Sequence, residues 1–285
     1  MQNKTRHCLV VANVLAGHGQ PLKILKGVQD YLEDQNLSYT LWTAGLPASL
    51  NEFTDVLLLG GDGTVNYFIN AFPGCTLPIG IIPAGSGNDL AAGLKLPADL
   101  PGQLASAIFG QTKAIDAGRC NDRLFINGVG IGFDGEAAKM VRSVRWLRGH
   151  LKYLYVVLRK ILTYRESVMH ILNGDEELRL QPTLMVSIAN GYRYGGGFKV
   201  APMADLQDGL FDLVMVDPLS VLQRFYHLPR IEAGRHLHLP FVHFRRTSRV
   251  NIQGTRPLTA QLDGEIMEGE YFDLELLPGK FWFRC

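Results

Sequence analysis

The sequence has little cysteine and almost no net charge. Its four cysteines, Cys8, Cys75, Cys120 and Cys285, stand far apart and form no C-x-x-C pair, which argues against a disulfide framework or a zinc knuckle and fits a reducing cytosol. A formal net charge of +1 over 285 residues gives no overall attraction to nucleic acid, so we expect no nucleic-acid partner. No apolar stretch approaches the roughly 20 residues that span a bilayer, and the N-terminus MQNKTRHCLVVANV predicts a strand rather than a signal peptide. We therefore expect a cytoplasmic protein.

The common nucleotide-binding signatures are also missing. No G-x-x-x-x-G-K-[ST] segment occurs, which excludes a Walker P-loop. The nearest approach to a dinucleotide fingerprint is NGVGIGFDG around Gly130, which lacks the following helix-binding glycine and falls in a β-rich part of the chain. We find no internal repeat and no low-complexity linker. His236, His238 and His243 have no cysteine or acid beside them to complete a zinc site, so we expect none there.

The first part of the chain alternates apolar strands with helices. Strands are expected at 7–14, 39–43, 55–60 and 77–83, and helices at 21–35, 64–72, 86–96 and 100–109. Strands without polar alternation, separated by helices, indicate a parallel sheet covered on both faces. Ligands on such sheets bind at the carboxyl ends of the strands.

The pattern changes after about residue 112. Short strand candidates separated by turn residues follow one another, as is typical of an antiparallel sandwich, and helices are expected only at about 136–164 and 219–233. We therefore predict an α/β plus mainly β protein. A Rossmann-like parallel α/β domain occupies 1–112 and an antiparallel β-sandwich domain occupies 113–285, and the C-terminal strand can return to the first domain.

Two glycine-rich turns stand out in the first domain. Gly60-Gly61-Asp62-Gly63-Thr64 lies between a buried strand and a helix, where successive backbone N–H groups can form an anion site. A plain strand-to-helix turn would explain two glycines but not Asp62, because an acid beside a phosphate is unfavourable unless it binds a metal or handles a proton. Pro83-Ala84-Gly85-Ser86-Gly87-Asn88-Asp89 repeats the arrangement one strand later. Two such turns on adjacent strands predict a phosphate-binding site.

These motifs resemble those of a known family. The segments that carry the resemblance, in the family's order, are GGDGTVN, PIGIIPAGSGNDLA, NGVGIGFDGEAA, SIANGYRYGGGFKVAP, DGLFDLVMV and LDGE. Over essentially its whole length, the chain resembles the diacylglycerol kinase catalytic-domain family in its soluble bacterial lipid-kinase branch. GGDGT alone is shared with NAD kinases and sphingosine kinases, and the combination is what makes the resemblance specific. The resemblance implies an NAD kinase/diacylglycerol kinase-like fold with the active site between the two domains. It also implies transfer of the γ-phosphoryl group of ATP, with Mg²⁺, to the hydroxyl of diacylglycerol or a related lipid.

The resemblance also assigns site residues. Glu265, in LDGE, matches the family's proton acceptor, and Asp62 would organise metal and phosphate. The alternative for LDGE is a plain hairpin turn, since Asp-Gly is a strong hairpin signal. Mg²⁺ is implied at Asp205, Asp208 and the Leu210 carbonyl, since hard oxygen ligands on a turn suit this ion; a surface turn before a strand is the alternative. The implied ATP contacts are Asn13, Thr43, Gly61, Asp62, Gly63, Thr64, Val65, Asn66, Tyr67 and Ser86.

Three positions depart from the family pattern. Tyr67 stands where the family usually carries Glu, Ala92 where it often carries Arg, and Val14 where a proline is usual. These departures leave open a non-catalytic nucleotide- or lipid-sensing relative, although the retention of Asp62, Asp208 and Glu265 together argues against it. A sphingoid-base or NAD kinase-like phosphotransferase is the other alternative, and GSGND and LDGE argue against NAD kinase. Nothing in the sequence separates the acceptor lipids.

The segment 139–165 is strongly basic. It contains eight Lys or Arg residues and no acid. Arg142, Arg145, Arg148 and Lys152 recur at the spacing of one helix face, with Trp146 and leucines beside them. Such a helix can lie on an anionic membrane, and the solvated face of a packing helix is the alternative. We expect peripheral contact with the inner face of the membrane. A homodimer is also compatible with the sequence. The basic residues are Lys139, Arg142, Arg145, Arg148, Lys152, Arg159, Lys160 and Arg165.

Overall fold

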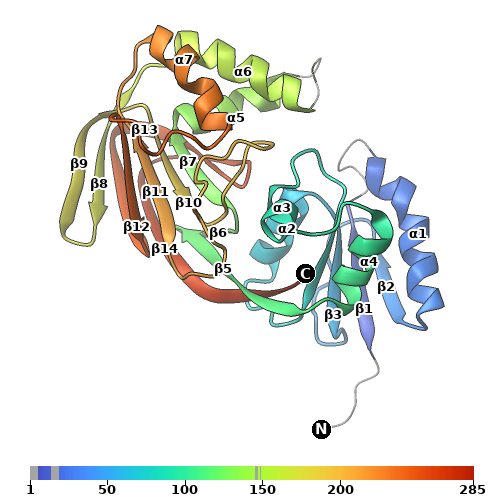
Figure 1. Cartoon of the computed structure of the whole chain (residues 1–285). Coiled ribbons are helices and arrows are strands. Elements are labelled where there is room, and N and C mark those ends of the chain that lie inside the picture. The colour runs from blue at the N-terminus through green and yellow to red at the C-terminus, as the bar shows by residue number, and fades with distance from the viewer. Residues whose placement is uncertain (1–5, 14–18, 145–146, 148) are drawn as a thin grey trace. The chain divides into compact units, whose positions relative to one another are not determined.

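The chain divides into two compact units. The structure, a computed structural model, describes residues 6–13, 19–144, 147 and 149–285. Unit 1 comprises Met1–Ile115 and Gly279–Cys285, and unit 2 comprises Asp116–Pro278. The chain passes from one unit to the other within two strands, β5 (Thr112–Cys120) and β14 (Glu265–Arg284) (Figure 1). The domain boundary expected at residue 112 coincides with the start of β5, and the last residues of β14 belong to unit 1.

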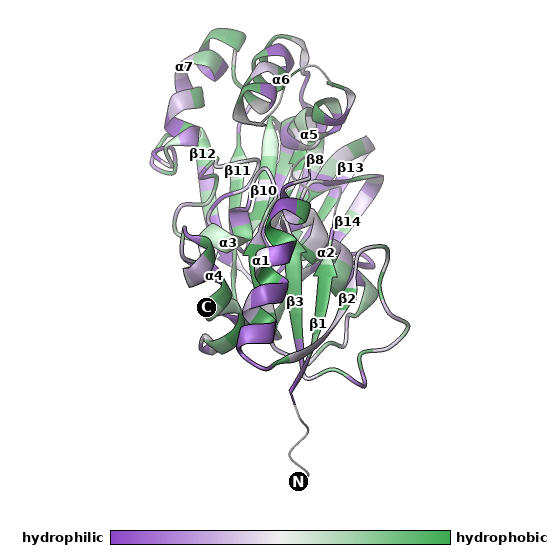
Figure 2. Cartoon of the chain, turned by 90° about the vertical axis from the view of Figure 1, so that its right-hand side faces the viewer, coloured by the Kyte–Doolittle hydropathy of each residue, from purple (hydrophilic) through white to green (hydrophobic). Residues whose placement is uncertain are grey.

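Unit 1 is built on a parallel sheet. Its strands follow the order β4-β3-β1-β2, and the end of β14 lies parallel to β4, with Phe283 opposite Ile79. All six residues of β3 are buried, and Figure 2 shows β1 and β3 as mostly hydrophobic while α1 alternates. The predicted parallel α/β fold is confirmed. The elements are β1 (His7–Ala12), α1 (Gln20–Asp34), β2 (Ser38–Trp42), β3 (Asp55–Gly60), α2 (Asp62–Ala71), β4 (Ile79–Pro83), α3 (Asp89–Gly93) and α4 (Leu100–Phe109).

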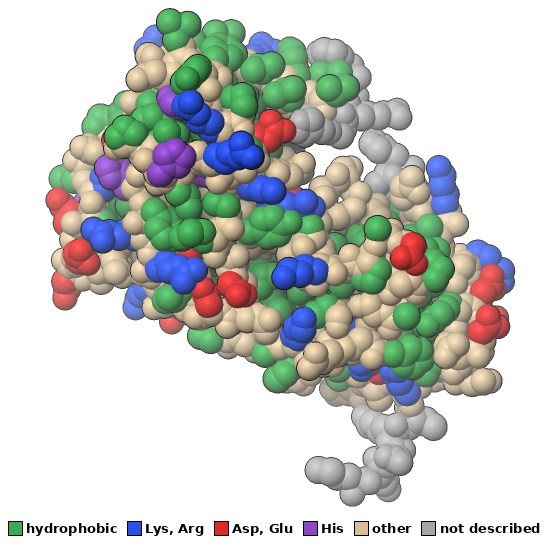
Figure 3. All heavy atoms as spheres, viewed as in Figure 1, with side chains coloured by type: hydrophobic (Ala, Val, Ile, Leu, Met, Phe, Trp, Pro, Cys, Tyr) green, Lys and Arg blue, Asp and Glu red, His purple; other side chains and the backbone are tan. Residues whose placement is uncertain are grey.

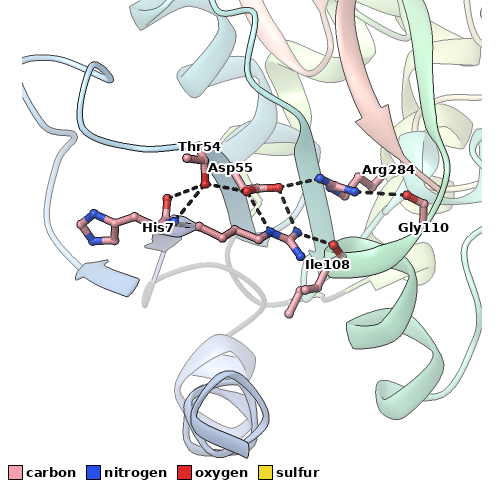
Figure 4. Close-up of polar contacts among 7 residues, drawn as sticks. His7, Thr54, Asp55, Ile108, Gly110 and Arg284 are labelled. Atoms are coloured by element: carbon pink, nitrogen blue, oxygen red, sulfur yellow. Dashed lines mark hydrogen bonds and ion pairs between the residues drawn. The ribbon is translucent and has the colours of Figure 1, made fainter. Parts of the chain in front are cut away.

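A buried carboxylate fastens the C-terminal strand to unit 1. Asp55, the first residue of β3, accepts hydrogen bonds from Arg6 at 2.9 and 3.0 Å, from Arg284 at 2.6 Å and from the Thr54 hydroxyl at 2.8 Å (Figure 4). Arg6 and Arg284 also donate to the carbonyls of Ile108 and Gly110. Burial alone would raise the pKa of Asp55, but these hydrogen bonds outweigh it and lower the pKa. The network lies at the end of β3 opposite the glycine turn.

Unit 2 is an antiparallel sandwich, as predicted. One sheet follows the order β12-β11-β10-β7-β13-β14, and the β8–β9 hairpin joins β13 at Asn251–Gly254. β13 is one long strand with a register shift between Gln253 and Leu258. The core lies between β7, β8, β10, β11, β13 and β14. The strands are β6 (Arg123–Phe125), β7 (Gly128–Gly132), β8 (Ser167–Asn173), β9 (Glu176–Thr183), β10 (Met185–Ala189), β11 (Phe211–Val216), β12 (Val242–Thr247) and β13 (Arg249–Leu262).

The helices of unit 2 correct one prediction. The single helix expected at 136–164 is two helices, α5 (Phe133–Ser143) and α6 (Gly149–Thr163); a third, α7 (Val221–Glu232), matches the other expected helix. α5 ends at Ser143, and the following Val144 is buried and has an extended backbone (φ −84°, ψ 113°). The expected shared face of Arg142 and Lys152 is therefore wrong, and Arg145, Trp146 and Arg148 lie outside the described residues. In the part of the chain that the structure describes, no helix is long and apolar enough to cross a membrane.

Candidate active site

The predicted nucleotide contacts follow the carboxyl ends of neighbouring strands in unit 1. β1, β2, β3 and β4 run parallel, with Ala12 opposite Leu59, Val11 opposite Trp42 and Gly60 opposite Pro83. Asn13 therefore follows β1, Thr43 follows β2, Gly61 to Tyr67 follow β3, and Ser86 follows β4. Because parallel strands end at the same edge of a sheet, the fold brings all of these positions to one edge.

The two glycine turns touch through their backbones. A Cβ on Gly61 would lie 2.8 Å from the Gly85 Cα, and a Cβ on Gly85 would lie 2.5 Å from the Gly61 Cα. The Ala84 N–H donates to the Gly60 carbonyl at 2.8 Å. The turn containing Gly85 is closed by Asn88, which has a left-handed backbone (φ 53°) and whose amide side chain both accepts from the Gly85 N–H and donates to the Gly85 carbonyl. Only glycine permits this approach at 61 and 85.

Asp62 ties the two turns together. Its carboxylate oxygens accept hydrogen bonds from the backbone N–H groups of Asp89, at 3.1 Å, and Leu90, at 3.0 Å. These N–H groups open α3, where no intrahelical acceptor exists for them. Asp62 therefore fixes the turn after β3 to the turn after β4. This structural contact, made across 27 and 28 residues of sequence, was not foreseen from the sequence, and Asn88 was missed with it.

The predicted nucleotide contacts differ in accessibility. The side chains of Thr64, Val65 and Asn66 are buried. The Thr64 hydroxyl accepts from the Asn13 side chain at 3.2 Å and lies under Gly60, whose added Cβ would meet it at 2.2 Å, so Thr64 links the turn to the end of β1. Gly61 and Asp62 are half-buried. The exposed positions are Asn13, Thr43, Gly63, Ser86 and Tyr67, of which Tyr67 is 58% exposed.

Glu265 lies at the tip of the β13–β14 hairpin in unit 2. The turn residues Asp263 and Gly264 both have positive φ, 47° and 88°, as expected of a tight Asp-Gly hairpin. The Asp263 carboxylate accepts from the backbone N–H groups of Ile126, Asn127 and Gly128 at 2.7, 2.9 and 3.0 Å. The tip is thus held against the start of β7, and Glu265 is fixed in backbone position while its side chain remains 62% exposed.

Helix α5 holds the other side of this hairpin. Arg142 donates to the Glu265 carboxylate at 2.8 Å and to the Gly264 carbonyl at 2.9 Å. At the start of α5, the buried Asp134 accepts from the Gln261 side chain, whose oxygen in turn accepts from the Gly264 N–H. The sequence pointed to Arg142 only as a membrane contact. No local pattern could have linked it to Glu265, which is 123 residues away.

The predicted Mg²⁺ ligands lie on one loop before β11. The Asp205 carboxylate accepts from the Gln207 N–H, and the Asp208 carboxylate accepts from the Leu210 N–H, both at 3.1 Å. Among the described residues, no cluster of three His, Cys, Asp or Glu side chains could hold a metal. The predicted set has two carboxylates and one backbone carbonyl, and Mg²⁺ keeps several waters and needs few protein ligands.

The charge of this loop fits a cation. Asp208 and the buried Asp212 share one guanidinium, that of Arg246, at 3.2 and 3.1 Å. The Oδ2 atom of Asp212 is buried and has no hydrogen-bond partner among the described residues. Burial raises the pKa of Asp212, and the neighbouring Asp208 raises it further against the opposing effect of Arg246. Two carboxylates, one in the loop and one in β11, therefore share a single guanidinium.

Two family models cover the chain. Residues 7–120 match the diacylglycerol kinase catalytic domain. Residues 127–282 match the YegS C-terminal NAD kinase beta sandwich-like domain. The two matches follow the α/β and β-rich parts in order.

Curated relatives agree with these models. The chain is 31% identical over 259 residues to a diacylglycerol kinase of Mycobacterium tuberculosis, covering 85% of this chain and 84% of that protein. It is 31% identical over 241 residues to a probable YegS-like lipid kinase of Klebsiella pneumoniae, covering 81% and 76%. The kinase relatives thus match most of both chains.

Solved structures share the fold. A putative diacylglycerol kinase from Bacillus anthracis superposes with a TM-score of 0.78 at 19% identity, covering 100% of this chain and 98% of that one. An NAD kinase from Archaeoglobus fulgidus, solved in complex with ATP, gives a TM-score of 0.54 at 14% identity, covering 98% and 93%. The fold is that of diacylglycerol and NAD kinases. Together with the 31% identity to curated kinases, the glycine turns and the LDGE hairpin place the chain in the diacylglycerol kinase catalytic-domain family, and it is a lipid kinase.

Proposed function

We propose that this enzyme uses ATP and Mg²⁺ to phosphorylate the hydroxyl of diacylglycerol or a related lipid. The observation that carries the proposal is the closure of two glycine turns on each other at the carboxyl edge of the unit 1 sheet. The backbones of the two turns are in contact, Asp62 joins the turns by hydrogen bonds, and Gly63 at the start of α2 remains exposed. Backbone N–H groups at a helix start bind phosphate.

In this proposal the nucleotide lies over the turns. Gly61, Asp62 and Gly63 offer backbone N–H groups to the phosphates, and Ser86 offers a hydroxyl from the second turn. The buried Thr64, Val65 and Asn66 act by holding α2 in place. The exposed Asn13, Thr43 and Tyr67 bind the rest of the nucleotide. Asp62 organises the phosphate site through the contact between the turns.

Mg²⁺ would be held by Asp205, Asp208 and the Leu210 carbonyl. When bound, the ion offsets negative charge at the loop and at phosphate. The sharing of one guanidinium by Asp208 and Asp212 supports this assignment, because a divalent cation would supply further positive charge to the two carboxylates.

Glu265 would orient the acceptor hydroxyl and take its proton as the hydroxyl oxygen attacks the γ-phosphorus, while the bond from the γ-phosphorus to the β,γ-bridging oxygen breaks and ADP leaves. One carboxylate oxygen accepts from Arg142, and the other is left for the lipid hydroxyl. The backbone of the hairpin tip is fixed by Asp263, so the base is held in a defined place.

The acceptor lipid brings the enzyme to the inner face of the membrane. Of the basic residues expected to serve this contact, Lys139, Arg142 and Lys160 instead pair with Glu268, Glu265 and Glu136. Lys152, Arg159 and Arg165 remain as contacts for anionic headgroups.

The testing experiment follows transfer of labelled γ-phosphate from ATP in mixed micelles, with and without Mg²⁺. The acceptor panel contains diacylglycerol, monoacylglycerol, a sphingoid base and, in solution, NAD. Labelled phosphatidate, the phosphorylated form of diacylglycerol, is the expected product, and it should form only with Mg²⁺. Labelled sphingoid base or NAD as the main product would reassign the acceptor. No product from any of these acceptors, despite ATP binding, would overturn the proposed acceptor class.

Gly63→Ala tests the nucleotide site separately. A Cβ at Gly63 meets nothing within 4 Å, and Ala is the better helix former by about 1 kcal/mol, so the fold is expected to keep or gain thermal stability. If phosphate sits on the exposed start of α2, the added methyl weakens ATP binding by about 10-fold or more, or about 1.4 kcal/mol. Gly74→Ala, also in open space, is the matched control. Equal ATP affinity in both variants would place the nucleotide elsewhere.

A further inference from the structure

Helix α7 buries two polar side chains and exposes most of its apolar ones, and among the described residues only Leu228 of its apolar side chains packs against the neighbouring core cluster. Its buried residues are Arg224 and His227, whereas a surface helix of a globular protein normally buries its apolar side and exposes its polar side. Among its exposed residues, Gln223 is used in the capping box with Ser220, and the Tyr226 hydroxyl accepts from Arg230. The exposed residues of α7 are Val221, Leu222, Gln223, Phe225, Tyr226 and Pro229.

The buried arginine fixes this orientation. Arg224 donates to the carbonyls of Leu219, Ile161 and Tyr164, at 2.9 to 3.1 Å, and pairs with Glu166. The carbonyls of Ile161 and Tyr164 lie at the end of α6, where intrahelical donors are missing. Arg224 therefore clamps α7 to the end of α6. Turning the apolar side of α7 inward would break these hydrogen bonds and leave a buried charge unpaired, so the outward apolar side is built in.

Exposed apolar side chains lie on both α7 and the neighbouring α6. Leu222 is 81% exposed and Tyr226 67%, and on α6 Leu151 and Leu162 are 66% and 62% exposed. Leu162 directly follows Ile161, whose carbonyl accepts from Arg224. Figure 3 shows hydrophobic side chains gathered at the end of unit 2 that α6 and α7 form, with Lys and Arg side chains beside them. We call Leu151, Leu162, Leu222, Phe225 and Tyr226 the α6–α7 surface.

The charges around this surface favour an anionic lipid bilayer over a protein partner. α6 contains no acidic residue, and the sole acid of α7 is its last residue, Glu232. The Arg230 guanidinium lies over the Tyr226 ring, 4.6 Å from its centre, and donates to the Tyr226 hydroxyl at 3.2 Å. Aromatic rings with a polar tip are common at the membrane–water interface, as are arginines whose charged group extends beyond an apolar surface. Tyr226 and Arg230 form such a pair.

We propose that the α6–α7 surface inserts into the headgroup region of an anionic bilayer. Leu222 and Tyr226 enter most deeply, and Arg159, Arg165 and Arg230 contact lipid phosphates. The choice of lipid as the occupant rests on the proposed function, since a kinase that acts on a membrane-dissolved acceptor must lie on the bilayer. The surface differs from the continuous basic helix that the sequence suggested, because apolar residues of α7 provide its deepest contacts.

The test measures binding to vesicles, without turnover. Sedimentation with vesicles of phosphatidylglycerol and phosphatidylcholine, and of phosphatidylcholine alone, compares wild type with the double variant Leu222→Ser/Tyr226→Ser. The matched control, Leu180→Ser/Tyr271→Ser, removes the same side-chain types, 55% and 53% exposed, from β9 and β14. Because all four side chains are exposed, both variants are expected to fold, and thermal unfolding checks this.

We expect wild type and control to bind the anionic vesicles and the α7 variant to bind about 10-fold or more weakly, because binding scales with buried apolar area. Wild-type affinity should fall without phosphatidylglycerol. Equal binding by all three proteins, or no binding by wild type, would overturn the proposal. Dimerisation of wild type that only the α7 variant loses would reveal a protein interface instead. If wild type binds vesicles but phosphorylates no lipid, and the α7 variant loses vesicle binding, the membrane surface stands and the proposed function is refuted.

Discussion

The glycine turns of unit 1 and the hairpin tip of unit 2 each present an exposed position on a fixed backbone, but they are built in opposite ways. At the glycine turns, closure depends on side chains that are absent, since the Gly61 and Gly85 backbones lie where a Cβ would clash. At the hairpin tip, closure depends on side chains that are present, since Asp263 and Gln261 supply acceptors for backbone N–H groups.

The difference has a consequence for substitution. The first site is damaged by adding atoms, and the second by removing acceptors. Asp62 connects the two modes, because it is a side-chain acceptor that serves the glycine turns. If the glycine turns bind ATP and the hairpin tip supplies the base, a substitution in one region should leave the measured property of the other region unchanged.

The largest effect is expected for Glu265→Gln. Loss of the proposed general base should lower kcat by about 10²- to 10⁴-fold, while ATP affinity, which we assign to the glycine turns, should stay unchanged. Single-turnover transfer of labelled phosphate and calorimetric ATP binding measure the two quantities. Glu268→Gln, on the same strand and paired with Lys139 in the same way, is the matched control. A loss of ATP binding in Glu265→Gln would break the separation between the two regions.

Asp263→Ala should show how much the hairpin depends on its acceptors. Three backbone N–H groups would lose their partner, and Ala would have to adopt a φ of 47°. We expect a loss of about 3 kcal/mol in the free energy of unfolding, measured by urea denaturation. Asp122→Ala, an exposed Asp in the turn between β5 and β6, should change stability little. Equal losses would mean that the three hydrogen bonds contribute nothing specific.

Gly61→Ala tests the opposite mode. The new Cβ would lie 2.8 Å from the Gly85 Cα, a backbone atom that cannot rotate away. We expect a loss of about 1–3 kcal/mol, together with weaker ATP binding because the turns separate. Gly74→Ala adds the same methyl in open space and should leave both quantities unchanged. An intact Gly61→Ala protein would show that the contact between the turns is not needed.

The sequence predicted the parts of the molecule that depend on local composition. Apolar runs ending in glycine turns gave the parallel sheet and its edge, and short strands with regular turns gave the sandwich. The helix at 136–164 was wrong in one respect, because helical spacing continued through Val144, where burial of that side chain in an extended backbone ends α5. Tertiary packing overrides periodicity at such a residue.

The contacts that complete the site span too much sequence to be predicted from one chain. Asp263 reaches N–H groups 135 to 137 residues away, and Asp62 reaches the start of α3. The LDGE motif predicted a turn and a base. It did not indicate that its aspartate stabilises the hairpin by accepting three backbone hydrogen bonds. The outward apolar side of α7 was equally hidden, because its cause is the clamp of Arg224 on α6.

The smallest effect is expected for Arg142→Ala, which tests whether the hairpin tip needs a side chain beyond its own turn. The Arg142–Glu265 pair is exposed, so the loss of stability should be below about 1 kcal/mol. Turnover should fall by about 3- to 10-fold, or about 0.7–1.4 kcal/mol of transition-state stabilisation, because the Glu265 carboxylate loses the hydrogen bond that orients it. Lys139→Ala removes the neighbouring exposed pair of α5 and should leave kcat unchanged. A fall in vesicle binding without a change in kcat would return Arg142 to the membrane contact that the sequence suggested, and the base would then be oriented by the hairpin alone.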